Sequence, residues 1–120
     1  MPKLLIVDDE RDITEFARNF FRKRDIDVYT SSSGDEALKI IHDEHPDLVL
    51  LDVRMEKMSG IEVLQRLKEN EKDIKIIMVS GVEEPEVVTE AKRLGVLGFI
   101  HKPLVIDELE KIVLKELQTT

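Results

Sequence analysis

The sequence has no cysteine in its 120 residues, which excludes disulfide bonds, thiol catalysis and thiolate metal sites. It also has no long hydrophobic run at its start, because Asp8 and Asp9 soon interrupt the first apolar stretch. The N-terminus is therefore neither a signal peptide nor a membrane span. These absences predict a soluble protein, and the lack of cysteine is compatible with a cytoplasmic location.

An excess of positive charge is absent as well. Lys and Arg number 18 against 26 Asp and Glu, and the net charge of −8 opposes direct binding to nucleic acid. One basic cluster, Arg22, Lys23 and Arg24, falls where a first helix should end. Cations there complement the helix dipole, and we favour this structural role over a phosphate-binding patch.

The apolar residues follow two periods along the chain. Short apolar runs predict strands, and apolar positions at helical spacing between them predict helices. A chain of this length forms one domain that buries roughly two-thirds of its unfolded surface. The predicted strands cover residues 3–8, 26–30, 47–52, 75–80 and 97–101.

Local signals mark where helices begin and end. Ser33 with Glu36, and Ser59 with Glu62, have capping-box spacing. Pro85 fits the first turn of a fourth helix, and a glycine fits the position after its end. The first helix carries an apolar stripe made of Ile13, Phe16, Ala17, Phe20 and Phe21.

Five repeats of strand then helix predict an α/β fold, a doubly wound parallel sheet with helices on both faces. The strand order cannot be read from the pattern alone. The two most hydrophobic strands end at Asp8 and Asp52, which suggests that they are central neighbours. We therefore favour the flavodoxin-like order 2-1-3-4-5, in which they flank the switch point where a ligand binds.

Charged and polar residues follow four of the five predicted strands. They are Asp8 and Asp9, Asp52, Ser80 and Lys102. Three carboxylates at one rim require a cation, because two unit charges ~4 Å apart repel by about 4 kcal/mol at an effective dielectric constant near 20. With only oxygen ligands on offer, Mg²⁺ is the expected ion, or Mn²⁺ in its place.

The charge balance of this rim suggests a reaction. Three carboxylates, one Mg²⁺ and Lys102 sum to about zero, so an anionic phosphoryl group can be accommodated. Asp52 is then the expected nucleophile, forming an acyl phosphate while the metal and Lys102 hold the phosphoryl oxygens. Ser80 can donate a hydrogen bond to one of these oxygens.

The chain resembles the response-regulator receiver domains of bacterial two-component signalling, including the chemotaxis regulator. The matching features are the acidic pair in IVDDE, the acceptor in LVLLDVRM, the hydroxyl in MVSG and the Lys-Pro of FIHKPL. Each motif alone is weak, but the set in this order is specific. The resemblance covers residues 1–120, which predicts a single receiver domain.

The resemblance implies roles for the residues around the metal. Asp52 would be phosphorylated by a sensor histidine kinase or a phosphotransfer protein. Asp9 would bind Mg²⁺ directly, Asp8 mostly through water, and the backbone carbonyl of Arg54 would be a third protein ligand. The domain would catalyse only its own phosphoryl transfer and slow autodephosphorylation, so we expect a signalling domain and not an enzyme.

The resemblance also implies a switch. Lys102 would pair first with Asp52 and then with the phosphoryl group on Asp52. The peptide bond between Lys102 and Pro103 would be cis. Ser80 and Phe99 would be the switch pair, changing the face formed by the fourth helix, fifth strand and fifth helix. A downstream protein or output domain would bind this face, with the chain a monomer or a phosphorylation-dependent dimer.

One residue departs from the family pattern. Glu56 stands where most receivers have proline, and we expect a more flexible loop with an extra negative charge near the metal. Arg54 and Val82 lie at positions that in the family tune the lifetime of the phosphoryl group.

Other readings of these residues stay open. Asp8 and Asp9 could cap the first helix, and Phe99 could be an ordinary core residue. An aspartyl-phosphate phosphatase would need a general acid where Arg54 stands, and a flavodoxin-like cofactor site would need a phosphate loop in place of DDERD. No G-x-G-x-x-G occurs to bind a dinucleotide. A metal-free pseudo-receiver, acting as an interaction module, is possible if Glu56 spoils the site.

Overall fold

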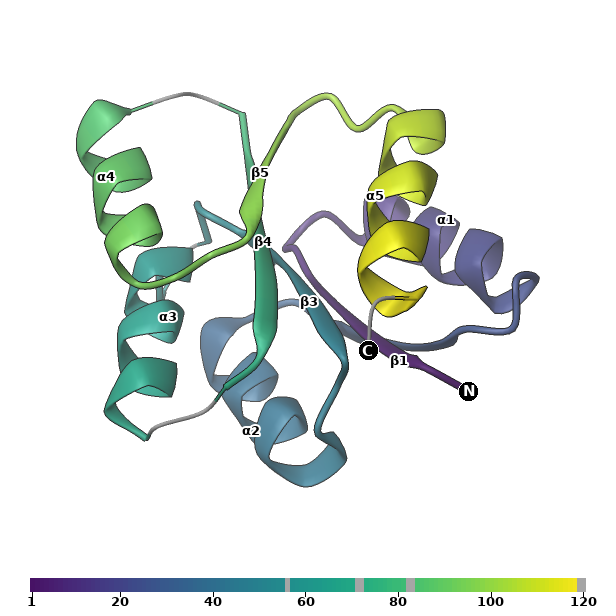
Figure 1. The fold of residues 1–120 in the computed structure, drawn as a ribbon, viewed down its shortest axis with the longest axis horizontal. Coiled ribbons are helices and arrows are strands. Elements are labelled where there is room, and N and C mark those ends of the chain that lie inside the picture. The colour runs from purple at the N-terminus through teal and green to yellow at the C-terminus, as the bar shows by residue number, and fades with distance from the viewer. Residues whose placement is uncertain (56, 71–72, 82–83, 119–120) are drawn as a thin grey trace.

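The computed structural model describes residues 1–55, 57–70, 73–81 and 84–118. Strand and helix alternate along this part of the chain (Figure 1). The strands are β1 (Lys3–Val7), β2 (Asp27–Ser31), β3 (Leu48–Asp52), β4 (Lys75–Ser80) and β5 (Gly98–His101). The helices are α1 (Arg11–Arg22), α2 (Gly34–Glu44), α3 (Gly60–Glu69), α4 (Pro85–Arg93) and α5 (Ile106–Gln118).

The sheet is parallel and its strand order is β2-β1-β3-β4-β5, as predicted. Strand β4 has the predicted bounds, while the others differ from the prediction by one residue at one or both ends. Asp8 lies just beyond β1, yet its N–H still donates to the carbonyl of Ser31 at 3.0 Å. On the other side of β1, Val7 pairs with Leu51 of β3, so the carboxyl ends of β1 and β3 lie side by side with their acidic residues at the same edge.

The helices cover both faces of the sheet, with α1 and α5 on one side and α2, α3 and α4 on the other (Figure 1). Alternate strand residues divide between the two cores. In β1, Leu4 and Ile6 pack towards α1 and α5, whereas Leu5 and Val7 pack towards α2 and α3. The apolar run of β1 is therefore explained by burial on both faces.

Strand β3 is the most completely buried element that the structure describes. None of its residues is more than 3% exposed, including Asp52 at its end. Burying a large aliphatic side chain contributes roughly 1.5–3 kcal/mol, so the four residues before Asp52 anchor the strand firmly. This rigid strand fixes the backbone that carries Asp52.

Helix boundaries follow the predicted local signals. The hydroxyl of Ser33 accepts from Glu36 N–H, and that of Ser59 accepts from Glu62 N–H, both at 3.3 Å. Pro85 starts α4, and Gly95 adopts a φ of 89° after its end, which a side chain would oppose. In the described part of the chain, no helix is long and apolar enough to span a membrane.

Helix α1 shows where an apolar stripe misleads. Ala17 and Phe21 are buried as the spacing suggests, but Phe16 is 61% exposed. At the end of α1, Arg24 stacks 3.5 Å from the ring centroid of Phe20 and forms an ion pair with Glu110 of α5. Arg24 of the basic cluster therefore binds α1 to α5, in keeping with the predicted structural role.

Gly60, the first residue of α3, lies against the end of β3. Its N–H donates to the carbonyl of Val53 at 2.9 Å, and an added Cβ would lie 2.4 Å from the backbone oxygen of Asp52. A contact that short forces backbone to move. Close packing of α3 on the acceptor strand thus depends on this glycine.

We predict that Gly60→Ala lowers the free energy of unfolding by about 2 kcal/mol, because the methyl group overpacks this contact. Urea denaturation measures the change. Gly98→Ala is the matched control, since no atom lies within 4 Å of its added Cβ, and it should leave stability unchanged or slightly raised. Equal stabilities for the two variants would contradict the prediction.

Candidate functional site

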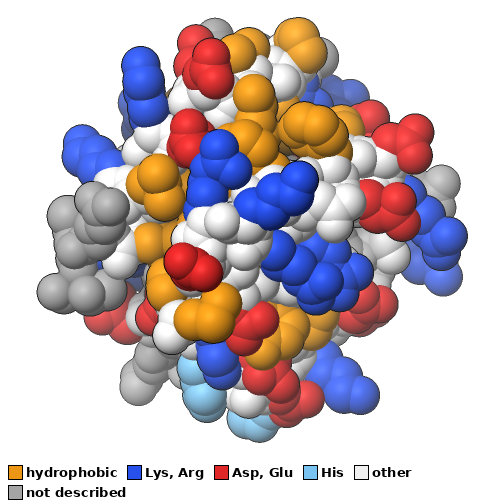
Figure 2. All heavy atoms as spheres, turned by 90° about the vertical axis from the view of Figure 1, so that its right-hand side faces the viewer, with side chains coloured by type: hydrophobic (Ala, Val, Ile, Leu, Met, Phe, Trp, Pro, Cys, Tyr) orange, Lys and Arg blue, Asp and Glu red, His pale blue; other side chains and the backbone are white. Residues whose placement is uncertain are grey.

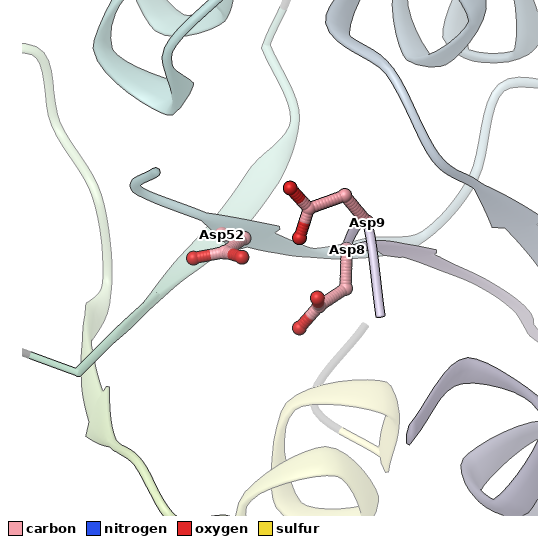
Figure 3. Close-up of side chains that lie close together, drawn as sticks. All are labelled: Asp8, Asp9 and Asp52. Carbon is pink, nitrogen blue, oxygen red and sulfur yellow. The ribbon is translucent and has the colours of Figure 1, made fainter. Parts of the chain in front are cut away.

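Three carboxylates meet at the carboxyl edge of the sheet. Asp8 and Asp9 follow β1, Asp52 ends β3, and each offers an oxygen within 4.8 Å of the others (Figure 3). Asp8 and Asp52 are 4% and 3% exposed, whereas Asp9 lies at the surface. The predicted acidic cluster is therefore real, with two buried members and one that faces solvent.

Lys102, which follows β5, connects the two buried carboxylates. Its Nζ lies 3.1 Å from Asp52 Oδ2, 3.2 Å from Asp8 Oδ2 and 3.3 Å from Glu10 Oε1. The backbone N–H of Lys102 donates to the carbonyl of Ser80 at 2.8 Å, which holds the residue beside the end of β4. The bond to Pro103 is cis, as the resemblance implied.

Each buried carboxylate divides its two oxygens in the same way. Asp52 Oδ1 accepts from Arg54 N–H at 3.2 Å, and Asp8 Oδ1 accepts from Glu10 N–H at 2.9 Å. The second oxygen of each faces Lys102. Asp8 therefore supports the turn that leads into α1 and contributes to the acidic cluster as well, but it does not cap the helix, because Glu10 is the N-cap and its side chain accepts no capping hydrogen bond.

Burial is the main influence on the pKa of Asp52. Loss of water raises this pKa above its usual value, and the nearby charge of Asp8 raises it further. The hydrogen bond and charge of Lys102, and the N–H of Arg54, act in the opposite direction. Without a metal ion, Asp52 is thus a destabilised carboxylate.

The pKa of Lys102 moves the other way from what burial alone would cause. Burial lowers it, but the hydrogen bond to Asp52 and the charges of Asp52 and Asp8 outweigh that effect and raise it above the usual value. Lys102 is therefore a permanent cation in this site, fixed between two anions.

The donor set fits a hard divalent cation. Only oxygen atoms converge on the space between Asp8, Asp9 and Asp52, and three carboxylates exceed the single charge of Lys102. Mg²⁺ prefers carboxylate oxygens and water, and it would relieve this excess of negative charge. The roles predicted for Asp9 and for the carbonyl of Arg54 as direct ligands stay predictions.

The predicted switch residues lie on neighbouring strands. Ser80 is the last residue of β4 and is 7% exposed. It directly follows Val79, the residue of β4 that pairs with Asp52. Phe99 in β5 is half-buried and packs against the core on the α2, α3 and α4 side. The structure therefore places Phe99 at the edge of that core, and its predicted movement stays a prediction. Glu56 and Val82 lie outside the described residues.

An apolar groove of about 570 Å³ lies beside the acidic cluster. Lys102 and Pro103 form the end nearest the carboxylates, and Phe16, Leu104 and Ile106 line its length between α1 and the start of α5. Figure 2 shows hydrophobic side chains in the upper part of the molecular face that includes α1 and α5. The sequence did not reveal this groove, because an exposed Phe16 and a buried one give the same apolar pattern.

Comparison with known proteins agrees with this geometry. A family model for the response regulator receiver domain matches residues 4–114. The chain belongs to the response-regulator receiver family. Receiver domains are signalling domains of two-component systems, in which aspartate phosphorylation and Mg²⁺ binding are typical.

Individual relatives match most of the chain. It is 38% identical over 115 residues to Sporulation initiation phosphotransferase F of Bacillus subtilis, covering 96% of this chain and 93% of that protein. It is 34% identical to Regulatory protein AtoC of Escherichia coli over 97% of this chain but only 25% of that protein. The solved structure of Vibrio cholerae chemotaxis protein CheY4 has a TM-score of 0.89 at 28% identity, covering 98% of this chain and 99% of that one.

We predict that the Asp52 carboxyl titrates above its usual pKa of 3.8 in the metal-free protein, as measured by carbon NMR of the side chain. Because the folded state then holds this proton more tightly than the unfolded chain, ionisation of Asp52 lowers the free energy of unfolding as pH rises from 3.8 through the folded pKa. Asp8→Asn removes a neighbouring negative charge and should lower the midpoint.

Asp43→Asn serves as the control for that titration, since Asp43 lies at the exposed surface of α2 and should leave the midpoint unmoved. A midpoint at or below 3.8 in the parent protein, or a rise in Asp8→Asn, would show that burial and Asp8 do not govern Asp52.

Proposed function

We propose that this receiver domain is a phosphorylation-dependent switch whose acceptor is Asp52. The observation that carries the proposal is the convergence on Asp52 of two further carboxylates and a half-buried lysine at the end of the most buried strand described. Three carboxylates around one lysine leave an excess of negative charge that lowers folding stability when no metal ion is bound, which supports a functional origin.

The phosphoryl donor is a histidine kinase or a phosphotransfer protein. A carboxylate oxygen of Asp52 attacks the phosphorus of a phosphohistidine, and a P–O bond forms as the P–N bond breaks. The bonding electron pair leaves with the imidazole nitrogen, which takes a proton from solvent. The product is an acyl phosphate on Asp52, and Lys102 is positioned to pair with one of the phosphoryl oxygens.

Asp8, Asp9, Asp52 and the backbone carbonyl of Arg54 would hold Mg²⁺, which neutralises charge on the transferring phosphoryl group when bound. The oxygen-only cluster supports Mg²⁺, and Mn²⁺ could take its place. Asp8 and Asp52 keep their orientation through the backbone N–H groups of Glu10 and Arg54. Their second oxygens face Lys102, and these are the oxygens whose ion pairs would change when the metal and the phosphoryl group bind.

Phosphorylation then changes a surface. Ser80 donates to the phosphoryl group and Phe99 turns into the space that the hydroxyl leaves, shifting the population towards a second conformation. The face of α4, β5 and α5 carries the change to a downstream protein, to an output domain or to a second copy of the chain. Exposed Leu97 and Val105, at 51% and 50%, flank β5 and support binding at this face.

The groove beside Lys102 supports docking of the phosphoryl donor. A protein that delivers a phosphohistidine must cover the mouth of the acidic cluster, and this apolar groove reaches that mouth at Lys102. Exposed aromatic side chains such as Phe16 contribute strongly to interfaces of this kind. Small phosphodonors do not need such contacts.

The proposal is tested with acetyl phosphate and Mg²⁺, with the protein mass as the measurement. We expect one phosphoryl group per chain in the parent protein and none in Asp52→Asn. Asp43→Asn, with the same chemical change at an exposed position of α2, should keep full uptake. Uptake that persists in Asp52→Asn, or that needs no divalent metal, would refute the assignment, while rapid turnover of phosphate monoesters would favour the phosphatase alternative.

We predict that Phe16→Ser slows phosphoryl transfer from the partner kinase about five- to thirtyfold while leaving uptake from acetyl phosphate unchanged. Removing an aromatic interface residue costs on the order of 1–2 kcal/mol of binding, and its distance from the chemistry spares the small donor. Rapid-quench assays with both donors measure the two rates. Equal effects on both donors, or none on the kinase reaction, would show that the groove is not the docking surface.

A further inference from the structure

An ion pair joins the two loops that follow β3 and β4. The guanidinium of Arg54 contacts the carboxylate of Glu84. Arg54 comes two residues after Asp52, and Glu84 comes immediately before α4. The pair therefore links the loop of the phosphoryl acceptor to the start of a helix on the proposed output face.

The backbone of this acceptor loop is held firmly. Val53 N–H donates to Val79 O at 2.9 Å, and Arg54 N–H donates to Asp52 Oδ1 at 3.2 Å. The side chain of Arg54 is in contrast 68% exposed. Arg54 can thus redirect its long side chain from Glu84 to an anion on Asp52 without movement of its own backbone.

The two possible partners of Arg54 compete. A guanidinium binds a phosphoryl group through two parallel hydrogen bonds, and a phosphoryl group adds close to two negative charges where Asp52 had one. Glu84 offers a single carboxylate with one negative charge. Arg54 cannot present its charge fully to both anions at the same time.

We propose that Glu84 is a positioning residue that holds Arg54 away from Asp52 in the unphosphorylated protein and competes with the phosphoryl group for it. The inference rests on the proposed function, since it needs an anion on Asp52. It assigns to Glu84 a role in setting how strongly the acceptor site holds that anion. Glu84 is also the N-cap residue of α4, so breaking its pair with Arg54 would couple the acceptor site to that helix.

The negative charge of Glu84 is stabilised at its position even without Arg54. A carboxylate at a helix N-terminus interacts favourably with the helix dipole, and Glu86 in the first turn of α4 does the same. Loss of the ion pair therefore leaves both partners in acceptable surroundings. The paired and unpaired states of Arg54 and Glu84 therefore differ little in free energy, as a reversible contact at the surface requires.

The test measures the affinity of the whole chain for beryllofluoride, a stable mimic of the phosphoryl group, by NMR titration with saturating Mg²⁺. Glu84→Gln should bind beryllofluoride about two- to fivefold more tightly than the parent, the range expected for an exposed ion pair. In an Arg54→Gln background, Glu84→Gln should have no effect. Glu86→Gln removes the same charge two residues away and should leave the affinity at the parent value in both backgrounds.

A second measurement needs neither metal nor beryllofluoride. The side-chain Nε–H signal of Arg54 should move and exchange faster in Glu84→Gln but not in Glu86→Gln. Unchanged beryllofluoride affinity in Glu84→Gln, or an equal gain in the Arg54→Gln background, would overturn the inference about Glu84 and leave the proposed function standing. No binding of beryllofluoride by any variant would overturn both.

Discussion

The site depends on one lysine placed between two buried carboxylates. Asp8 and Asp52 each turn one oxygen to Lys102 and the other to a backbone N–H. If Lys102 were absent, two buried negative charges would face each other with little solvent to separate them. Lys102 therefore compensates the negative charges that Asp8 and Asp52 place at the ends of β1 and β3.

The rest of the fold provides what this arrangement needs. Strand β3 is buried along its whole length, so the backbone of Asp52 is fixed by packing and not by the charges around it. Gly60 lets α3 approach the acceptor strand closely. Rigid packing below the site and unfavourable charge within it are consistent with a site built to receive a cation and an anion.

Much of this could be predicted from the sequence because it follows from local rules. The two helix caps at Ser33 and Ser59, and the stop at Gly95, depend on residues close together in the chain. The meeting of Asp8, Asp52 and Lys102 follows from the topology once the strands are assigned.

Other features have no local signal. Phe16 is 61% exposed and lines the groove between α1 and the start of α5, which apolar spacing does not reveal. The start of β2 was predicted one residue early, because Ile26 N–H bonds to Phe21 O at the end of α1 and the paired strand begins at Asp27. The pair of Arg54 with Glu84 joins two loops that are distant in sequence, so only the folded arrangement shows it.

The central claim is that Lys102 neutralises carboxylates whose charge a metal ion compensates in the active state. The Mg²⁺ dissociation constant of Lys102→Met tests this claim most directly. The account predicts that this variant binds Mg²⁺ about tenfold more tightly than the parent, equivalent to ~1.4 kcal/mol, because the competing cation is gone. Its metal-free form should also unfold at a lower temperature than the parent. Weaker or unchanged Mg²⁺ binding in Lys102→Met would contradict the account.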